Sequence, residues 1–380
     1  MKRLLIVAII AALISTKAMA LEPVGEGALT IPVPSAVLME KTTGEVIYEK
    51  DAHTKRAPAS VTKIMTLLLV MEEIESGRLT EADIVTCSSF AASMGGSQIW
   101  LEEGEQMSVS DMLKAVSVVS ANDCAVAMAE HISGSEESFV QKMNARAAEL
   151  GMVDTHFCDC TGLTDDPTHL TTAYDIALMS RELLKYDRIK NYSTIWMDTL
   201  RNGAAQLVNT NKLVRFYKGA TGLKTGFTTT AMYCLSATAE REGTEYIAVV
   251  MHGATSDERF ESAKTLLNFA FANYALCPLR SPKPLPPVLV SMGASESVQP
   301  IYGGEEGLLM EKNKLGEINY EFSLPDSLEA PITEGEAIGE MVVYSNGTEL
   351  ARVPLLAGSN VNKLTVFGLY GRMLSRLFGG

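Results

Sequence analysis

Ser60 and Lys63 form the first pair of residues whose types and spacing suit nucleophilic catalysis. Pro58 precedes the serine and a strongly apolar segment follows it, which predicts a buried helix that begins at Ser60. Residues three apart share a helix face, so Lys63 should stand beside the Ser60 hydroxyl. Burial lowers the pKa of a lysine, and a neutral amine can accept the proton of an attacking serine. The alternative is an N-capping serine beside a lysine that reaches solvent.

Two further motifs carry polar side chains suited to the same chemistry. Ser120-Ala121-Asn122 is predicted to lie in a loop between two helices, where a hydroxyl and an amide would face a cleft. Lys224-Thr225-Gly226 offers a cation, a hydroxyl and a backbone that a ligand can approach closely. Taken singly, the first motif also fits a helix-capping loop and the second a turn.

The order of the three motifs is more informative than any one of them. An S-x-x-K, a serine-asparagine element and a K-T-G occur in penicillin-binding proteins and class A β-lactamases. On these motifs the chain resembles the low-molecular-weight penicillin-binding proteins of the D-alanyl-D-alanine carboxypeptidase family (peptidase family S11). The resemblance runs from about Ala36 to the C-terminus, and its most specific stretches are 59–66, 95–97, 120–123 and 222–226.

The resemblance implies a serine-type carboxypeptidase that removes the terminal D-alanine of peptidoglycan stem pentapeptides. Ser60 would attack the D-Ala-D-Ala peptide carbonyl and form an acyl-enzyme, which water then hydrolyses. Lys63 would act as the base. Ser120 and Asn122 would relay protons and position the substrate, with assistance from Lys224.

Substrate binding is implied by the same resemblance. The N–H groups of Ser60 and Phe227 would form the oxyanion hole, next to Gly226. Thr225 and Arg259 would bind the terminal carboxylate, a task that suits the fork of an arginine. β-Lactams would acylate the same serine. Neither a cofactor nor a metal is expected.

Two features depart from the family pattern. Segment 159–163 is Asp-Cys-Thr-Gly-Leu where the family often has Asn-Pro-x-Gly-Leu, so the conformation of this loop stays open. No Glu-x-x-Leu-Asn lies between Ser120 and Lys224, where class A β-lactamases carry their deacylating glutamate, so efficient antibiotic hydrolysis is not expected. A β-lactamase or transpeptidase of the same fold and a non-catalytic penicillin-binding sensor are the alternatives. The complete catalytic set argues against the sensor.

Other chemistries have weaker support. A zinc cluster is one alternative, but the spacing of the four candidate ligands fits no common pattern. These candidates are His156, Cys158, Cys160 and His169. The remaining histidines are scattered, which disfavours a Ser-His-Asp hydrolase. The net charge of −14 argues against a nucleic-acid partner. The six cysteines lie mostly in apolar stretches, so mostly free thiols are expected.

The elements that must position these motifs mix helices and strands. Strands are predicted at 36–39, 45–48, 233–239 and 246–251. Helices are predicted at 60–76, 111–119, 123–131, 136–150, 172–186 and 257–274. The expected fold class is α+β: a β-lactamase/penicillin-binding-protein-like domain, implied by the resemblance to have an antiparallel sheet flanked by helices, then a small all-β domain and a C-terminal amphipathic helix.

The domain boundaries follow from composition. Residues 1–20 combine a positive start, a short apolar run and a small-residue cleavage point, which predicts a signal peptide; a retained anchor is the alternative. The serine peptidase (transpeptidase-like) domain is expected at 25–277. Five prolines at 278–287 predict a stiff linker. The β-rich domain is expected at 288–358, where Asn346-Gly347 predicts a hairpin.

The tail at 362–380 differs from both domains. Seven apolar side chains recur on one helical face: Val366, Phe367, Tyr370, Met373, Leu374, Leu377 and Phe378. The only charges of the tail are basic. This pattern predicts peripheral membrane contact through an interfacial helix, on an exported protein at the outer face of the cytoplasmic membrane, in the cell-wall space. A helix docked on the protein's own surface is the alternative.

Overall fold

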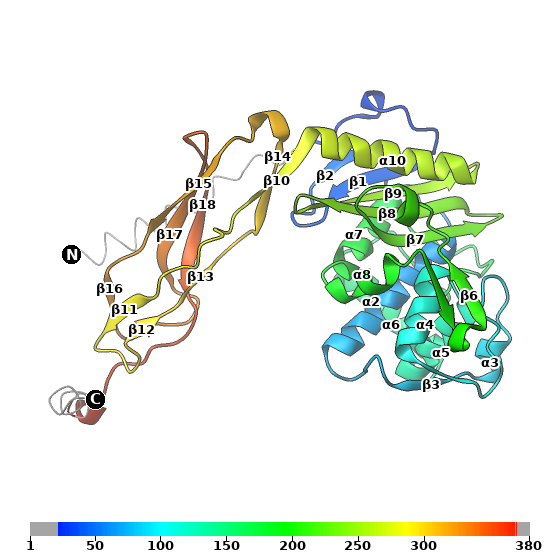
Figure 1. Ribbon diagram of the computed structural model, residues 1–380, viewed down its shortest axis with the longest axis horizontal. Coiled ribbons are helices and arrows are strands. Elements are labelled where there is room, and N and C mark those ends of the chain that lie inside the picture. Colours follow the sequence, from blue (N-terminus) through cyan, green and yellow to red (C-terminus); the bar gives the residue numbers. More distant parts are fainter. Residues whose placement is uncertain (1–21, 369, 371–380) are drawn as a thin grey trace. The chain divides into compact units, whose positions relative to one another are not determined.

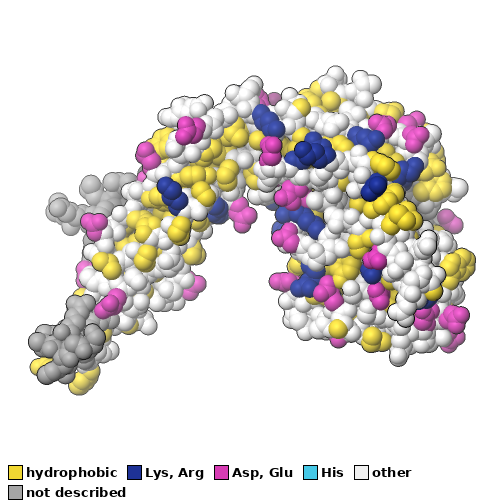
Figure 2. All heavy atoms as spheres, in the orientation of Figure 1, with side chains coloured by type: hydrophobic (Ala, Val, Ile, Leu, Met, Phe, Trp, Pro, Cys, Tyr) yellow, Lys and Arg dark blue, Asp and Glu magenta, His cyan; other side chains and the backbone are white. Residues whose placement is uncertain are grey.

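The computed structural model describes residues 22–368 and 370, which fold into two compact units (Figure 1). The first unit ends at Ala272 and the second begins at Asn273. On the face shown in Figure 2, Lys and Arg side chains lie interspersed with Asp and Glu side chains. All six cysteines carry free thiols.

A five-stranded antiparallel sheet forms the framework of the first unit, in the order β2-β1-β9-β8-β7. Its strands are β1 (Ser35–Glu40), β2 (Val46–Lys50), β7 (Ala220–Thr228), β8 (Met232–Arg241) and β9 (Thr244–Gly253). All six residues of β1 are buried, because helices cover both faces of the sheet (Figure 1). The strand β7 lies at one edge, which leaves that edge available for a ligand.

Helices make up most of the rest of this unit. They are α2 (Lys63–Glu75), α3 (Ser89–Ala92), α4 (Val109–Val118), α5 (Asn122–Ser133), α6 (Glu136–Glu149), α7 (Ala173–Leu183), α8 (Lys190–Ser193), α9 (Leu213–Phe216) and α10 (Ser256–Asn273). The α10 helix packs on one face of the sheet, where Phe271 contacts Tyr246 of β9 edge to face. The first nine residues of α2 are buried, as its apolar sequence predicts.

Most predicted elements of the first unit are present, with ends shifted by a few residues. The predicted helix at 60–76 begins as a 3₁₀ turn (Ala59–Thr62) before α2. The helix predicted at 172–186 has Thr172 as its cap, since the Thr172 hydroxyl accepts the Asp175 N–H at 3.0 Å, but it ends at Leu183. The prediction missed β7 and two short hairpins. Those hairpins are β3 (Ile84–Thr86) with β4 (Gln106–Ser108), and β5 (Met197–Leu200) with β6 (Ala205–Val208).

The second unit consists mainly of strands. They are β10 (Tyr274–Pro278), β11 (Val288–Ser291), β12 (Ser297–Val298), β13 (Pro300–Tyr302), β14 (Gly307–Glu311), β15 (Ile318–Ser323), β16 (Ser327–Glu329), β17 (Ala337–Ser345) and β18 (Thr348–Ala357). The largest of its sheets has the order β13-β18-β17-β15. Asn346 and Gly347 join β17 to β18 with φ values of 48° and 77°, the left-handed turn that this dipeptide predicts.

The proline-rich segment at 278–287 packs against the second unit. Leu279 and Leu285 lie in its core with Cys277 and Met341. The segment therefore packs as part of the second unit. That unit begins at Asn273, a few residues before the linker expected at 278–287.

The two ends of the chain are only partly described. The expected signal peptide at 1–20 lies outside the described residues, as does most of the expected amphipathic helix at 362–380. Residues 366–368 and 370 are helical, and the Val366 and Phe367 side chains are exposed. Among the described residues, no helix combines the length and apolar character needed to cross a bilayer.

Candidate active site

Ser60 and Lys63 lie together as the S-x-x-K spacing predicts. The Lys63 Nζ donates hydrogen bonds to the Ser60 Oγ at 3.0 Å and to the Thr161 carbonyl oxygen at 2.8 Å. Ser60 is partly exposed, whereas the Lys63 side chain is wholly buried. Burial lowers the pKa of Lys63 from 10.5 to about 8, against the opposing influence of nearby Cys160 and Asp159. At this pKa about a tenth of the amine is neutral at pH 7, and this is the form that a base requires.

A loop at 158–170 supports the nucleophile from behind. Ala59 has a φ of 49°, and its carbonyl group lies so close to Gly162 that a Cβ there would be 1.9 Å from the oxygen. The Asp159 carboxylate accepts the N–H groups of Thr161 and Thr164 at 2.8 and 2.7 Å. These bonds hold the Thr161 carbonyl that orients Lys63. They also fix the conformation of segment 159–163, where the sequence departs from the family pattern.

His169 ties this loop to the helix that carries the nucleophile. Its Nδ1 accepts the Cys158 N–H at 2.9 Å, so its proton is on Nε2, which donates to the Thr62 hydroxyl at 2.9 Å. Burial lowers the pKa of His169 and favours this neutral form. Of the four residues considered for zinc, Cys158 and His169 bond to each other, and no group of three possible ligand side chains gathers anywhere in residues 22–368 or at 370.

The K-T-G motif lies on β7, directly beside Ser60. A Cβ at Gly226 would be 2.8 Å from the Pro58 carbonyl oxygen and 3.1 Å from the Ser60 nitrogen, so only glycine allows this approach. Lys224 is buried and donates to the Thr225 carbonyl at 2.9 Å. Burial lowers its pKa, and the positive charges of Lys63 and Arg259 lower it further.

The two residues expected to bind a carboxylate occupy different positions. The Thr225 hydroxyl lies 2.7 Å from that of Thr210, on the edge strand beside the nucleophile. Arg259 is buried behind β7, where its Nη1 donates to the carbonyl oxygens of Gly226 at 3.2 Å and Cys234 at 3.3 Å. Burial lowers its pKa to about 10. In this structure Arg259 supports the strand, and the buried Thr225 hydroxyl pairs with that of Thr210.

Ser120 and Asn122 lie at the start of α5. The Asn122 side chain donates to the Gly95 carbonyl at 2.7 Å, and its N–H donates to the Ser97 carbonyl at 2.7 Å. The Asn122 Oδ1 and the Ser120 Oγ are buried, and neither finds a hydrogen-bond partner within the described part of the chain. Buried polar atoms without partners are uncommon, and these two are free to hydrogen-bond a substrate.

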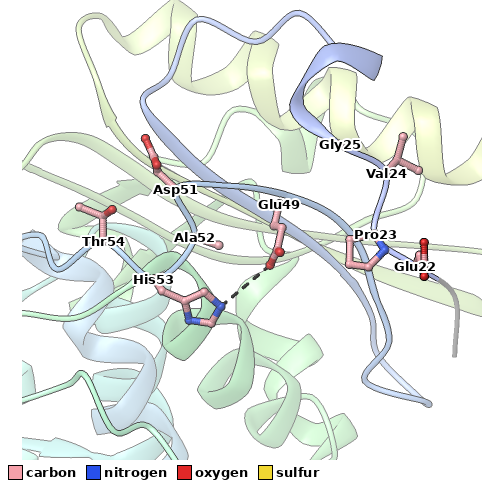
Figure 3. Close-up of a pocket in the computed structure, with 9 residues that line it drawn as sticks. All are labelled: Glu22, Pro23, Val24, Gly25, Glu49, Asp51, Ala52, His53 and Thr54. Atoms are coloured by element: carbon pink, nitrogen blue, oxygen red, sulfur yellow. Dashed lines mark ion pairs between the residues drawn. The ribbon is translucent and has the colours of Figure 1, made fainter.

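Two cavities lie against the first unit. One, of about 370 Å³, lies against the nucleophile turn and is lined by Ala59, Gly162 and Thr228, among others. The other, of about 720 Å³, is lined by 22–25, 49 and 51–54, where His53 Nε2 lies 3.9 Å from Glu49 (Figure 3). The three motifs line neither cavity, but the smaller one includes Pro58 and Ala59, which directly precede Ser60.

Comparisons with known proteins agree with this geometry. The sequence profile of a family described as D-alanyl-D-alanine carboxypeptidase, peptidase S11, matches residues 22–255. The D-alanyl-D-alanine carboxypeptidase DacF of Bacillus subtilis strain 168 is 42% identical over 334 residues, which cover 87% of this chain and 86% of that protein.

The chain belongs to the D-alanyl-D-alanine carboxypeptidase family. DacD of Escherichia coli K12 is 32% identical and aligns over 90% of this carboxypeptidase and 88% of its own length. A second profile, described as the C-terminal domain of penicillin-binding protein 5, matches residues 287–363. The predicted family and enzyme class, a D-Ala-D-Ala carboxypeptidase and hydrolase, are confirmed.

Solved structures of similar proteins confirm the predicted α+β fold class. Penicillin-binding protein 5 of Haemophilus influenzae superposes with a TM-score of 0.70 at 29% identity, over 88% of this carboxypeptidase and 99% of that chain. Penicillin-binding protein D2 of Listeria monocytogenes, in its ampicillin-bound form, has a TM-score of 0.59 at 30% identity over 64% of this chain and 99% of its own.

Proposed function

We propose that this carboxypeptidase removes the terminal D-alanine of peptidoglycan stem pentapeptides through an acyl-enzyme on Ser60. The observation that carries the proposal is the 3.0 Å contact between a buried lysine of lowered pKa and a partly exposed serine hydroxyl. A serine needs an adjacent base to become a nucleophile, and Lys63 meets both the distance and the pKa requirement.

In the acylation step, the neutral Lys63 amine accepts the Ser60 proton as the Oγ attacks the carbonyl carbon between the two D-alanines. The N–H groups of Ser60 and Phe227 stabilise the oxyanion, since β7 lies directly against the nucleophile turn. The C–N bond then breaks, and the departing D-alanine amine takes the proton through Ser120. Asn122 and Lys224 position the substrate around this hydroxyl.

In the deacylation step, water attacks the ester carbonyl and its proton passes to Lys63. The C–O bond to Ser60 breaks, Lys63 returns the proton to the Ser60 oxygen, and the shortened peptide is released. The hydroxyl of Thr225 binds the terminal carboxylate during acylation, while Arg259 fixes the β7 backbone and adds positive charge beneath it. A β-lactam enters the same cycle by acylating Ser60.

The proposed activity is tested by D-alanine release from a D-Ala-D-Ala peptide and by labelling with a fluorescent penicillin. Labelling together with repeated release supports the carboxypeptidase. Labelling without release would favour a penicillin-binding sensor of the same fold, and hydrolysis of the penicillin faster than of the peptide would favour a β-lactamase.

We also propose that the protein is exported and acts in the cell-wall space, attached peripherally to the outer face of the cytoplasmic membrane by residues 362–380. The exposed Val366 and Phe367 begin the apolar stripe, and the basic charges of the tail suit anionic lipid. Truncation after Gly358 should release the protein from membranes. A truncated protein that still fractionates with membranes would contradict the anchor.

A further inference from the structure

Segment 95–101 is joined to the start of α5 through Asn122. The Asn122 side chain donates to the Gly95 carbonyl and its backbone N–H to the Ser97 carbonyl, both at 2.7 Å. A Cβ at Gly96 would be 2.9 Å from the Asn122 Nδ2, so the segment and this amide are in contact. The place of the Asn122 side chain is therefore set by segment 95–101 as well as by α5.

Two charged side chains hold the end of this segment. The buried Asp123 carboxylate accepts the N–H groups of Ile99 at 3.1 Å and Leu101 at 3.0 Å. The Arg201 guanidinium donates to the carbonyl oxygens of Ile99 at 2.8 Å and Trp100 at 3.2 Å. Hydrogen bonds to a charged group are roughly twice as strong as neutral ones, and residues 99–101 receive four of them.

The backbone of Trp100 needs this support. Its φ of 62° is in the left-handed region, which a bulky side chain rarely adopts. The Trp100 side chain is 73% exposed, so packing of the indole does not hold this conformation. Backbone strain of this kind persists only where the surroundings over-determine it. The hydrogen bonds to Asp123 and Arg201 supply that constraint.

Arg201 belongs to a different part of the first unit. It lies at the turn between β5 and β6, and the chain runs on from β6 to Thr210, whose hydroxyl lies 2.7 Å from that of Thr225. The Arg201 guanidinium also pairs with the Glu105 carboxylate at 2.7 and 2.9 Å, which fixes its direction. One arginine thus links the hairpin that precedes Thr210 to the segment that contacts Asn122.

We propose that Arg201 is a positioning residue for the carboxypeptidase reaction. Together with Asp123 it clamps residues 99–101, and the clamped segment sets the place of the Asn122 amide beside the substrate. Arg201 would act on the substrate only through Asn122. This inference rests on the proposed function, because it takes the role of Asn122 from it.

A double-mutant cycle tests whether Arg201 acts through Asn122. The rate of labelling by a fluorescent penicillin is measured for wild type, Arg201→Gln, Asn122→Ala and the double variant. Since the Arg201 side chain is 29% exposed, its substitutions should fold. Arg201→Gln should slow labelling about tenfold, because two charge-assisted hydrogen bonds are lost. Arg201→Lys should recover part of the rate, since an ammonium is charged but lacks the fork of a guanidinium.

The background decides the interpretation. In Asn122→Ala, the further change Arg201→Gln should slow labelling by less than about twofold, because the group through which Arg201 acts is already absent. Arg352→Gln is the matched control: Arg352 also pairs with two carboxylates, those of Glu340 and Glu349, but in the second unit. It should label at the wild-type rate. An equal loss from Arg201→Gln in both backgrounds would overturn the positioning role and leave the carboxypeptidase activity standing.

The Asn122 amide can also be observed without turnover. In protein prepared with isotope-labelled asparagine, the NMR signal of the Asn122 side-chain amide is identified by its absence from Asn122→Ala. This signal should shift in Arg201→Gln and stay in place in Arg352→Gln. The shift supports the positioning role even if the wild type releases no D-alanine, an outcome that would defeat the proposed function alone. An unchanged signal in Arg201→Gln would overturn the positioning role.

Discussion

Gly162 lies against the carbonyl group of Ala59, the residue that precedes the nucleophile, and a Cβ at Gly162 would be 1.9 Å from that oxygen. Gly162 also has a φ of 75°, which only glycine adopts without strain. The nucleophile turn and the loop that orients Lys63 are therefore in direct backbone contact. Any change that separates them should move Ser60 and Lys63 apart.

Replacing Gly162 by alanine should impair acylation far more than it impairs folding. Misplacement of reacting groups by about 1 Å costs on the order of 100-fold in rate, so penicillin labelling should slow by about that factor. Gly151→Ala is the matched control, since Gly151 has the same φ of 75° but open space around it. It should lose about 1 kcal/mol of unfolding free energy and label normally. Equal labelling rates for the two variants would contradict the proposed contact.

The rate of acylation should rise with pH and level off above about pH 8. The cause is the pKa of Lys63, which burial lowers to about 8, because only the neutral amine can accept the Ser60 proton. Stopped-flow labelling with a chromogenic β-lactam from pH 6 to pH 10 measures this profile. A rate that does not change across this range would show that Lys63 is not the base.

The same lowered pKa should make stability depend on pH. Between pH 8 and pH 10.5 the unfolded lysine holds a proton that the folded one has lost, so the free energy of unfolding should rise with pH in this window. Below pH 8 the full cost of burying the charge, roughly 3 kcal/mol, is present. Lys63→Met lacks this titration, so its stability relative to wild type should decline from pH 8 to pH 10. Urea unfolding at several pH values measures the difference, and a constant difference would contradict the expectation.

Thr210 should support catalysis through Thr225. The two hydroxyls lie 2.7 Å apart, so Thr210 can donate to the Thr225 oxygen while the Thr225 proton turns toward a substrate carboxylate. Thr210→Val should lower kcat/KM for a D-Ala-D-Ala peptide about fivefold, mainly through KM, the effect of one neutral hydrogen bond. Thr265→Val, which removes an exposed hydroxyl bonded within α10, should leave it unchanged. If Thr210→Val lowers kcat/KM equally for a substrate that lacks the terminal carboxylate, Thr210 has a purely structural role.

The sequence predicts the elements whose signal is local. The apolar run after Ser60 yields the buried α2, and Asn346-Gly347 yields the hairpin between β17 and β18. The contact between Ser60 and Lys63 follows from helical spacing alone. The three motifs are recognisable because their side chains carry the chemistry.

The missed features depend on contacts distant in sequence. The strand β7 contains two glycines and alternates poorly, so nothing local marks it as a strand, although it pairs with β8 along its length. The Thr161 carbonyl that orients Lys63 is a backbone group, which any residue type could supply. Thr210 bonds to a residue 15 positions away and His169 to one 107 positions away, and neither contact leaves a signal in composition or periodicity.

The most direct test of the central claim uses the covalent intermediate itself. Wild type, Ser60→Ala and Lys63→Ala are each incubated with a fluorescent penicillin and, separately, with a D-Ala-D-Ala peptide, and intact mass and D-alanine release are measured. We expect wild type to gain the mass of one penicillin at Ser60 and to release D-alanine repeatedly. Both variants should remain folded and lose at least about 10⁴-fold in turnover. Labelling of folded Ser60→Ala, or D-alanine release by it at the wild-type rate, would contradict the assignment of Ser60 as the nucleophile.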